Sequence, residues 1–325
     1  MREALFIKQN TQRWKDYENS KSKTPDELAE SFISITDDLA YAKTFYPQSN
    51  TTKYLNGLAA TFHQSIYKNK KEKSNRFINF WRYELPLIFY KHRRPLLYSF
   101  LFFIVFSLIG ALSAKYDNTF VRLIMGDDYV NMTNENIAKG DAFGVYKQEG
   151  PFLMFVMIAL NNIKVELVVF VMGIFLSVGT IYQLLQNGVM LGSFQYYFFS
   201  KGLGFKSILV LWLHGTLEIS AIIIAGGAGL ILGNSILFPK THTRMVSLRH
   251  GAKDGLKIAI GIIPIFLTAA FFEGFVTRHT EMAVWQSLVI LISSLVFIIW
   301  YVIVYPANLN RKLNRNNQII NETTY

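Results

Sequence analysis

The hydrophobic and polar positions of this 325-residue chain divide it into two parts with different patterns. Before residue 75, apolar residues recur every three or four positions, which predicts amphipathic helices. Between residues 96 and 305, long apolar runs dominate, and they approach or exceed the roughly 20 residues that a helix needs to cross a bilayer. These runs show no strict alternation of apolar and polar residues, so they predict membrane helices rather than a barrel.

Residues 1–75 are expected to form a small helical region on the cytoplasmic side. One helix is predicted to begin at Thr24, where Thr24 and Glu27 make a capping box around Pro25, and to end at Tyr46. Its apolar stripe comprises Leu28, Phe32, Ile35 and Leu39. The stripe of a second helix comprises Tyr54, Leu55, Leu58, Phe62 and Ile66. The two stripes are expected to pack on each other, with the segment around Trp14 or a partner protein as alternatives.

Residues 76–94 mix aromatic, apolar and charged residues in a stretch that is too short and too polar to span. This segment predicts a helix lying in the membrane interface. A first span is expected over 96–114, starting on the cytoplasmic side after the basic residues Arg93 and Arg94. The following segment, 115–150, has four basic and six acidic residues, which suits the outer face.

Residues 151–238 are the hardest part of the chain to divide into spans. We expect a surface helix over 151–162, a second span over 163–185 and a short span over 188–200. The run from 207 to 238 would be about 48 Å long as a helix, which exceeds the roughly 30 Å hydrocarbon core. A break at His214-Gly215 is therefore predicted within it.

Residues 239–257 carry five basic residues and one acidic residue, which predicts a cytoplasmic loop. Two last spans are expected over 256–277 and 284–305, within a membrane domain of residues 95–306, and a basic cytoplasmic tail follows at 307–325. An outer residue 150 and an inner residue 239 require an odd number of crossings between them. The predicted fold is therefore all-α, a polytopic bundle of about six spans, of which one could instead be a re-entrant hairpin.

The composition agrees with this division. The chain is 51% hydrophobic and only 17% charged, below the roughly 25% typical of soluble domains. It contains no cysteine, which excludes disulfides and thiolate chemistry. The net charge of +11 is explained by basic residues flanking the spans, so no nucleic acid is expected as a partner.

Three ionisable residues stand out because they fall at membrane depth: His214, Glu218 and Glu273. Such groups are rare and usually face the bundle interior, so a functional site is the default hypothesis. An ion or proton relay, recognition of a polar substrate and a purely structural hydrogen-bonded cluster are all open readings. The last is favoured, because buried polar groups often serve packing specificity. Further polar residues that could join such a cluster are Asn161, Asn162, Asn187 and Thr277.

Other patterns are better explained by packing or by chance. The segment 214–218 is not the His-Glu-x-x-His of a metalloprotease, and with so few ligands no metal site is expected. The segment 202–207 lacks the spacing of a phosphate loop. Gly226, Gly229 and Gly233 imitate a dinucleotide fingerprint, but in an apolar helix they are predicted to let another helix approach closely.

Four motifs in order resemble a known family. They are Asn161-Asn162 with the later Gly173, the run 186–192 (Gln-Asn-Gly-Val-Met-Leu-Gly), the run 213–219 (Leu-His-Gly-Thr-Leu-Glu-Ile) and the run 272–277 (Phe-Glu-Gly-Phe-Val-Thr). Together they are similar to the stage II sporulation protein M (SpoIIM) family, over roughly 77–305. The basic segment before the first span departs from the family pattern.

The resemblance implies a partner protein of the bacterial inner (cytoplasmic) membrane. The apolar runs and the basic segments beside them predict that it is multi-pass with both termini in the cytoplasm. The first hypothesis is a non-enzymatic scaffold or assembly role with other envelope or membrane proteins, in contact with membrane lipids, with a homodimer as one form that it could take. Neither a cofactor nor an enzymatic activity is expected. The alternative is a transporter or permease-like subunit for a small polar or lipid-linked substrate, in which the His/Glu residues contact the substrate.

Overall fold

The structure is a computed structural model that describes residues 2–19, 25–67, 76–117, 119–144, 150–278 and 282–323. The chain divides into two compact units, residues 1–76 and residues 77–325. Both are helical throughout their ordered elements, so the predicted all-α class is confirmed for the described residues. The expected capping residue Thr24 lies outside them.

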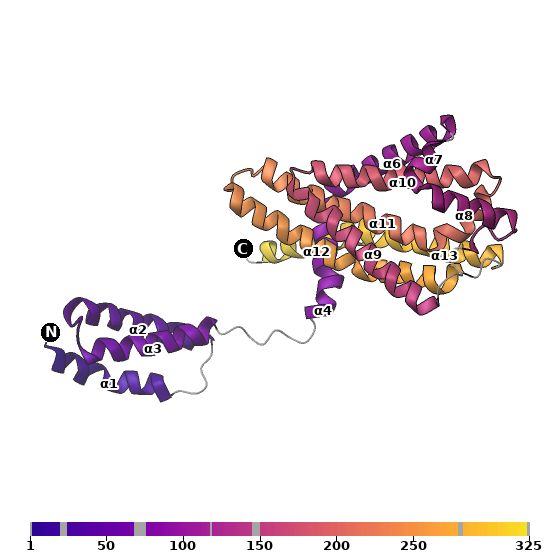
Figure 1. The fold of residues 1–325 in the computed structure, drawn as a ribbon. Coiled ribbons are helices and arrows are strands. Elements are labelled where there is room, and N and C mark those ends of the chain that lie inside the picture. Colours follow the sequence, from indigo (N-terminus) through magenta and orange to yellow (C-terminus); the bar gives the residue numbers. More distant parts are fainter. Residues whose placement is uncertain are drawn as a thin grey trace. The chain divides into compact units, whose positions relative to one another are not determined.

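The N-terminal unit is a three-helix arrangement of α1 (Glu3–Asn19), α2 (Pro25–Phe45) and α3 (Asn50–Tyr67), shown in indigo in Figure 1. Its apolar stripes meet in one core that also includes the side chain of Trp14. The Trp14 indole Nε1 donates a hydrogen bond to Asp38 Oδ2 at 2.7 Å, which satisfies its buried polar end. The stripes therefore pack on each other and on the segment around Trp14.

The second unit contains the membrane helices. Its elements are α4 (Arg76–Asn79), η1 (Phe80–Glu84), α5 (Leu85–Lys91), α6 (Arg93–Tyr116), α7 (Phe120–Met125), α8 (Asp127–Ala138), α9 (Pro151–Val171), η3 (Met172–Ile174), α10 (Val178–Ser200), α11 (Gly204–Leu237), α12 (Arg244–Phe271), η4 (Phe272–Thr277), α13 (Val284–Ile299), η5 (Trp300–Val304) and α14 (Tyr305–Thr323). Among the residues that the structure describes, five helical segments of this unit are long and apolar enough to cross a membrane: 93–116, 151–174, 204–237, 244–277 and 284–315.

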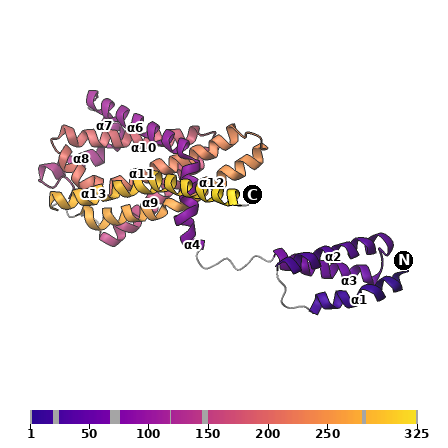
Figure 2. The ribbon, with the colours of Figure 1, turned by 180° about the vertical axis from the view of Figure 1, so that it is seen from behind.

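Helix α11 lies at the centre of the bundle, against α6, α9, α10, α12 and α13. In an apolar 18-residue stretch of α11, 61% of the residues are buried. The corresponding stretch of residues 284–315, which include α13, has 11% of its residues buried. Figure 1 shows α10 beside α6 on one side of α11, and Figure 2 shows α13 in yellow, which packs against α11. Apolar side chains on the outer helices face away from the core, as lipid contact requires.

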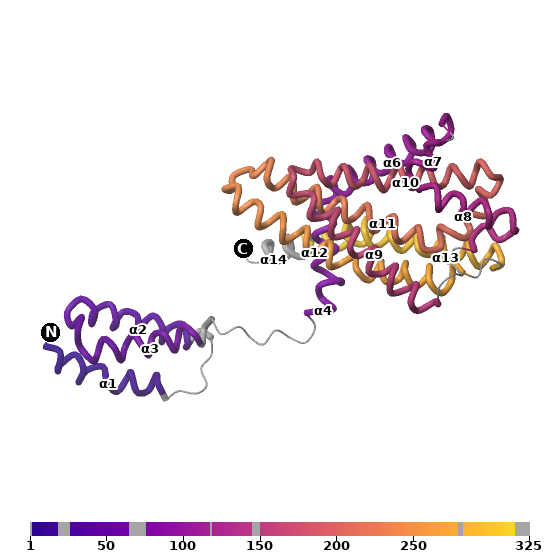
Figure 3. Tube along the Cα trace, viewed as in Figure 1, coloured from indigo at the N-terminus to yellow at the C-terminus, as the bar shows by residue number. Residues whose placement is uncertain are grey.

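The ends of the helices show that α9, α10 and α11 alternate in direction. Tyr197 near the end of α10 donates a hydrogen bond to Asn134 of α8, and Pro151 at the start of α9 lies against Gly274 of η4. At the opposite end, the hydroxyl of Ser247 in α12 donates to the carbonyl of Ser235 in α11. Figures 1 and 3 show α7 and α8 at one end and the α11–α12 turn at the other.

Two expected boundaries are wrong. There is no separate surface helix over 151–162, because α9 begins at Pro151 and continues to Val171. The expected span 163–185 is interrupted by a turn in which Leu176 and Ser177 adopt positive φ angles of 53° and 69°. Such angles are rare for non-glycine residues.

The expected break at His214-Gly215 is also wrong. Helix α11 runs without interruption from Gly204 to Leu237, and its 34 residues make it longer than the hydrocarbon core is thick. Helix α10, with 23 residues, packs along α6 and α11 but is not among the five apolar candidates. The number of crossings therefore stays a prediction of six.

Residues 76–91 pack on the bundle through a buried apolar face. Leu85 is fully buried against Gly261 of α12, and the Trp81 indole donates to the carbonyl of Gly261 at 3.0 Å. The hydroxyl of Tyr301 donates to the carbonyl of Trp81 at 2.8 Å. Phe77 at the start of this segment remains 73% exposed, so one end of the predicted interfacial helix presents an aromatic side chain outward.

Candidate functional site

The candidate site begins with two ionisable side chains on the central helix. His214 and Glu218 are four residues apart on α11, which places them on one face. His214 is only 6% exposed. Because the helix backbone satisfies its own hydrogen bonds here, the site is built from side chains rather than from a broken helix.

A π-helical turn supplies the third ionisable side chain of the site, Glu273. Helix α12 ends at Phe271, and η4 continues it with a wider turn that contains Glu273 and Thr277. The hydroxyl of Thr277 donates to the carbonyl of Phe272, five residues earlier, at 3.1 Å. Such turns are frequent at functional sites, although the described chain has two others, η1 and η5, outside this site.

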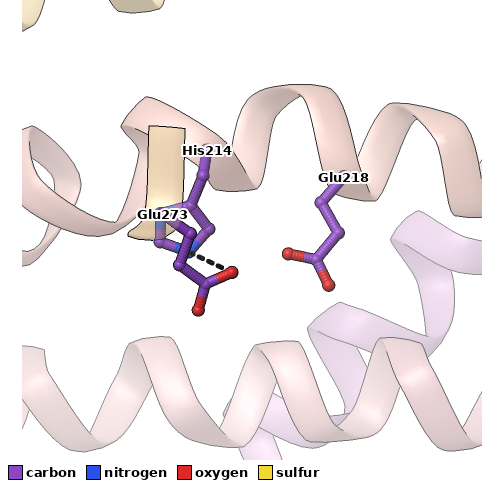
Figure 4. Close-up of side chains that lie close together, drawn as sticks. All are labelled: His214, Glu218 and Glu273. Carbon is purple, nitrogen blue, oxygen red and sulfur yellow. Dashed lines mark ion pairs between the residues drawn. The ribbon is translucent and has the colours of Figure 1, made fainter. Parts of the chain in front are cut away.

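The structure brings His214, Glu218 and Glu273 together. One nitrogen or oxygen of each lies within 4.8 Å of the others, and His214 Nε2 is 3.8 Å from Glu273 Oε2. Figure 4 shows the carboxylate of Glu273 beside the imidazole and that of Glu218 facing the same space. Within the described part of the chain, neither carboxylate accepts a hydrogen bond, and no lysine or arginine forms an ion pair with either.

Thr277 fixes the orientation of the imidazole. His214 Nδ1 lies 3.0 Å from Thr277 Oγ1, whose single proton is directed to the Phe272 carbonyl. With the hydroxyl proton on the Phe272 carbonyl, the hydroxyl oxygen is the acceptor and Nδ1–H the donor; the opposite tautomer would reverse these roles. In a neutral imidazole with this hydrogen bond, Nε2 is the basic nitrogen, and it lies on the side of Glu273.

A cavity of about 360 Å³ reaches His214 and Glu218. It is bounded by α6, α7, α8, α10 and α11, and its lining is mainly apolar. The lining residues are Phe103, Ile124, Met125, Tyr129, Asn187, Met190, Leu191, Phe194, Gln195, Leu211, Trp212, His214, Gly215, Glu218, Ile219 and Ile222. An apolar cavity with a few convergent polar groups is the usual form of a small-molecule site.

The polar groups of the cavity wall are held in fixed positions. The Trp212 indole donates to Gln195 Oε1 at 2.9 Å, and Gln195 Nε2 donates to Ser207 Oγ at 2.8 Å. Burial is the main cause that raises the pKa of Tyr129 to about 12, and the nearby Tyr197 and Glu273 add to it. The Tyr129 hydroxyl therefore remains protonated at physiological pH.

The other polar residues singled out from the sequence do not all join this site. Asn187 lines the cavity and donates to the carbonyl of Gln183 at 2.8 Å. Asn161 is exposed, so its expected place in a buried cluster is wrong. Asn162 is 6% exposed on α9, away from the cavity lining, and its amide nitrogen has no partner among the described residues.

Glu166 was missed as a candidate by the sequence reasoning. Its side chain is completely buried, and neither oxygen has a hydrogen-bond partner within the described ranges. It lies one turn after Asn162 on the same face of α9. The signal was present, because a carboxylate deep within an apolar run is as unusual as Glu218 or Glu273.

The three packing glycines lie where α11 meets its neighbours. A Cβ atom at Gly226 would collide with Ser99 of α6, and one at Gly229 with Thr180 of α10. A Cβ at Gly233 would collide with Ser177 in the turn before α10. Small residues at these positions thus allow close helix contact around the central helix.

Comparison with protein families identifies the membrane unit. Residues 99–278, more than half of the chain, match the family model of stage II sporulation protein M, or SpoIIM. The chain belongs to the SpoIIM family. The match includes His214, Glu218, Glu273 and Thr277, so the candidate site lies wholly within the SpoIIM domain. Helix α13 and the elements after it lie beyond the matched range.

The N-terminal unit matches a second family model, a domain of unknown function (DUF8413), over residues 4–68. This range coincides with α1 to α3 and is separate from the SpoIIM match. Comparison with curated proteins and with solved structures gives no match.

Proposed function

We propose that the SpoIIM domain of this protein binds a small polar or lipid-linked substrate in the cavity between α6, α10 and α11, as the membrane subunit of a transport system. The observation that carries this proposal is the cavity of about 360 Å³ in which apolar walls surround His214 and Glu218. Ionisable groups at membrane depth are costly and typically mark substrate or ion pathways. The proposed role is binding and transport rather than an enzymatic reaction.

The location and orientation belong to the same proposal. The protein resides in the bacterial cytoplasmic membrane, with both termini and the basic segment 239–257 in the cytoplasm. The segment with α7 and α8 covers the outer end of the cavity. Membrane lipids contact the apolar faces of α6 and α13, and further envelope proteins or a second copy of the chain are its protein partners.

A cavity-filling variant tests the substrate proposal. Gly215 lines the cavity, and a Cβ at this position would meet only Ile219 Cδ1, at 3.9 Å, so a side chain can start from it without a backbone clash. Wild type and Gly215→Leu are purified in nanodiscs, and the small molecules and lipids that copurify are identified by mass spectrometry. We expect wild type to retain a ligand that Gly215→Leu loses.

The matched control is Leu108→Phe, which enlarges a side chain that is 58% exposed on the lipid-facing surface of α6. This variant is expected to retain the same ligand as wild type. Identical sets of bound molecules in wild type and Gly215→Leu would contradict the proposed use of the cavity.

A scaffold role is the second candidate, and it is favoured by the N-terminal unit. This unit has its own core and its own family match, as expected for a docking module. A chain that starts at Ser74 is expected to insert in the same orientation but to lose a cytoplasmic partner in pull-down experiments. Identical partners for the full and shortened chains would argue against the docking role.

A further inference from the structure

We propose that His214, Glu218 and Glu273 bind one divalent transition-metal ion, with zinc as the representative ion. The sequence predicted no metal site, because the three residues do not form a recognisable motif. The tertiary structure changes this expectation by placing one ligand atom of each residue within 4.8 Å of the others.

The distances are close to those that a metal ion requires. Two ligands at about 2.0–2.2 Å from a tetrahedral zinc ion are roughly 3.4 Å apart. His214 Nε2 and Glu273 Oε2 are separated by 3.8 Å, so a small side-chain movement would bring both into coordination. Glu218 sits on the same helical face as His214 and supplies the third ligand.

The electrostatics also favour a divalent cation. Within the described residues, neither carboxylate accepts a hydrogen bond or pairs with a lysine or arginine, and the basic group beside Glu273 is the His214 imidazole at 3.8 Å. Two partly buried negative charges with no lysine or arginine beside them would repel each other. A divalent ion with two carboxylates and a neutral imidazole gives a site with no net charge.

Thr277 would hold the ligating histidine in place by a hydrogen bond to the ring nitrogen that does not face the metal. Ligating histidines usually donate their other ring N–H to an oxygen, which fixes the tautomer and the ring orientation. His214 Nδ1 lies 3.0 Å from Thr277 Oγ1 with this arrangement. Thr277 is therefore a positioning residue, and the fourth coordination position would face the cavity that His214 and Glu218 line.

The test measures zinc binding by the purified full-length protein in detergent, after treatment with a chelator. Wild type is expected to bind about one zinc ion per chain, counted by elemental analysis. His214→Ala and Glu273→Gln are expected to weaken binding by more than tenfold. Thr277→Val is expected to weaken it by about tenfold, the lower end of the usual second-shell effect.

Two control variants make the result specific. Glu166→Gln removes another buried membrane carboxylate and should bind zinc as wild type does. His242→Ala disrupts a pair of histidine rings, His242 and His250, whose centroids are 5.8 Å apart, and should also leave binding unchanged. Loss of binding in either control, unchanged binding in Glu273→Gln, or no stoichiometric zinc in wild type would overturn the proposal.

Two further readouts do not depend on every variant being equally stable. Zinc should raise the melting temperature of chelator-treated wild type but not of Glu273→Gln, whose side chain has nearly the same volume. Cobalt should give wild type a visible absorption spectrum that changes in Glu218→Gln. Neither measurement uses a transported substrate, so a failed metal site and a failed substrate proposal are distinguishable.

Discussion

At the residue scale, Glu273 and His214 are partners within a buried polar cluster, and the choice of substitution should matter. Glu273→Gln keeps a polar group beside the imidazole, whereas Glu273→Leu leaves it facing an apolar side chain. We expect Leu to lower the free energy of unfolding by about 1–3 kcal/mol more than Gln does, because Leu replaces the polar neighbour that lies 3.8 Å from His214 Nε2 with an apolar one. The measurement is thermal unfolding in detergent with chelator present, so that metal binding does not contribute. Equal stability of the two variants would contradict the structural role of this contact.

Glu166 should behave in the opposite way. It is completely buried on α9 with both oxygens unpartnered among the described residues, so the folded state bears the cost of its desolvation. Glu166→Leu should therefore stabilise the protein by about 1–3 kcal/mol. Asn161→Leu, at an exposed position of the same helix, should change stability by less than about 0.5 kcal/mol. If Glu166→Leu proved destabilising in the same unfolding assay, this carboxyl group would have a stabilising partner.

At the scale of elements, α6 and α10 approach each other through glycine. A Cβ at Gly192 would collide with the backbone of Ser107 and Ala111, and one at Gly110 with the backbone of Val189. Backbone atoms cannot move aside as a flexible side chain can, so even one methyl group forces the two helices apart. The contact between these helices is therefore sensitive to a single substitution.

Gly192→Ala tests this sensitivity. We expect it to lower stability by about 1–3 kcal/mol, the usual cost of overpacking. Gly215→Ala is the matched control, because its new Cβ would meet only Ile219 Cδ1 at 3.9 Å, and it should be tolerated. The melting temperatures of Gly192→Ala and Gly215→Ala in detergent are compared, and a lower value for Gly192→Ala alone would confirm the steric effect. A similar loss in both variants would indicate a general effect of removing glycine from a helix rather than a steric one.

At the scale of the whole molecule, the direction of each helix fixes which segments share a side of the membrane. The chain has no native cysteine, so single cysteines give an unambiguous readout. We expect Asn131→Cys on α8 to react with a membrane-impermeant reagent from outside and Met245→Cys on α12 only from the cytoplasm. Both positions are exposed in the structure. Labelling of both from the same side would contradict the proposed orientation and the odd number of crossings between them.

The sequence by itself determined the class of the protein and the approximate position of most spans. Residues 93–116, 244–277 and 284–315 contain the expected spans 96–114, 256–277 and 284–305, because a long apolar run without water must satisfy its backbone as a helix. The expected loop 239–257 is wrong in part, because α12 already begins at Arg244. The packing of α2 on α3 was also predictable from the sequence, since in water the apolar stripe of a helix marks its buried face.

Only the tertiary structure decided where the chain turns and which polar residues meet. The reversal at residues 175–177 depends on positive φ angles at Leu176 and Ser177. Neither position is a glycine, the residue type from which a positive φ angle could have been predicted. The continuity of α11 at Gly215 is supported by neighbouring helices on several sides. In a membrane, both lipid-facing and buried positions are apolar, so periodicity does not distinguish them. For that reason the exposure of Asn161, the burial of Glu166 and the approach of Glu273 to His214 followed from packing and not from pattern.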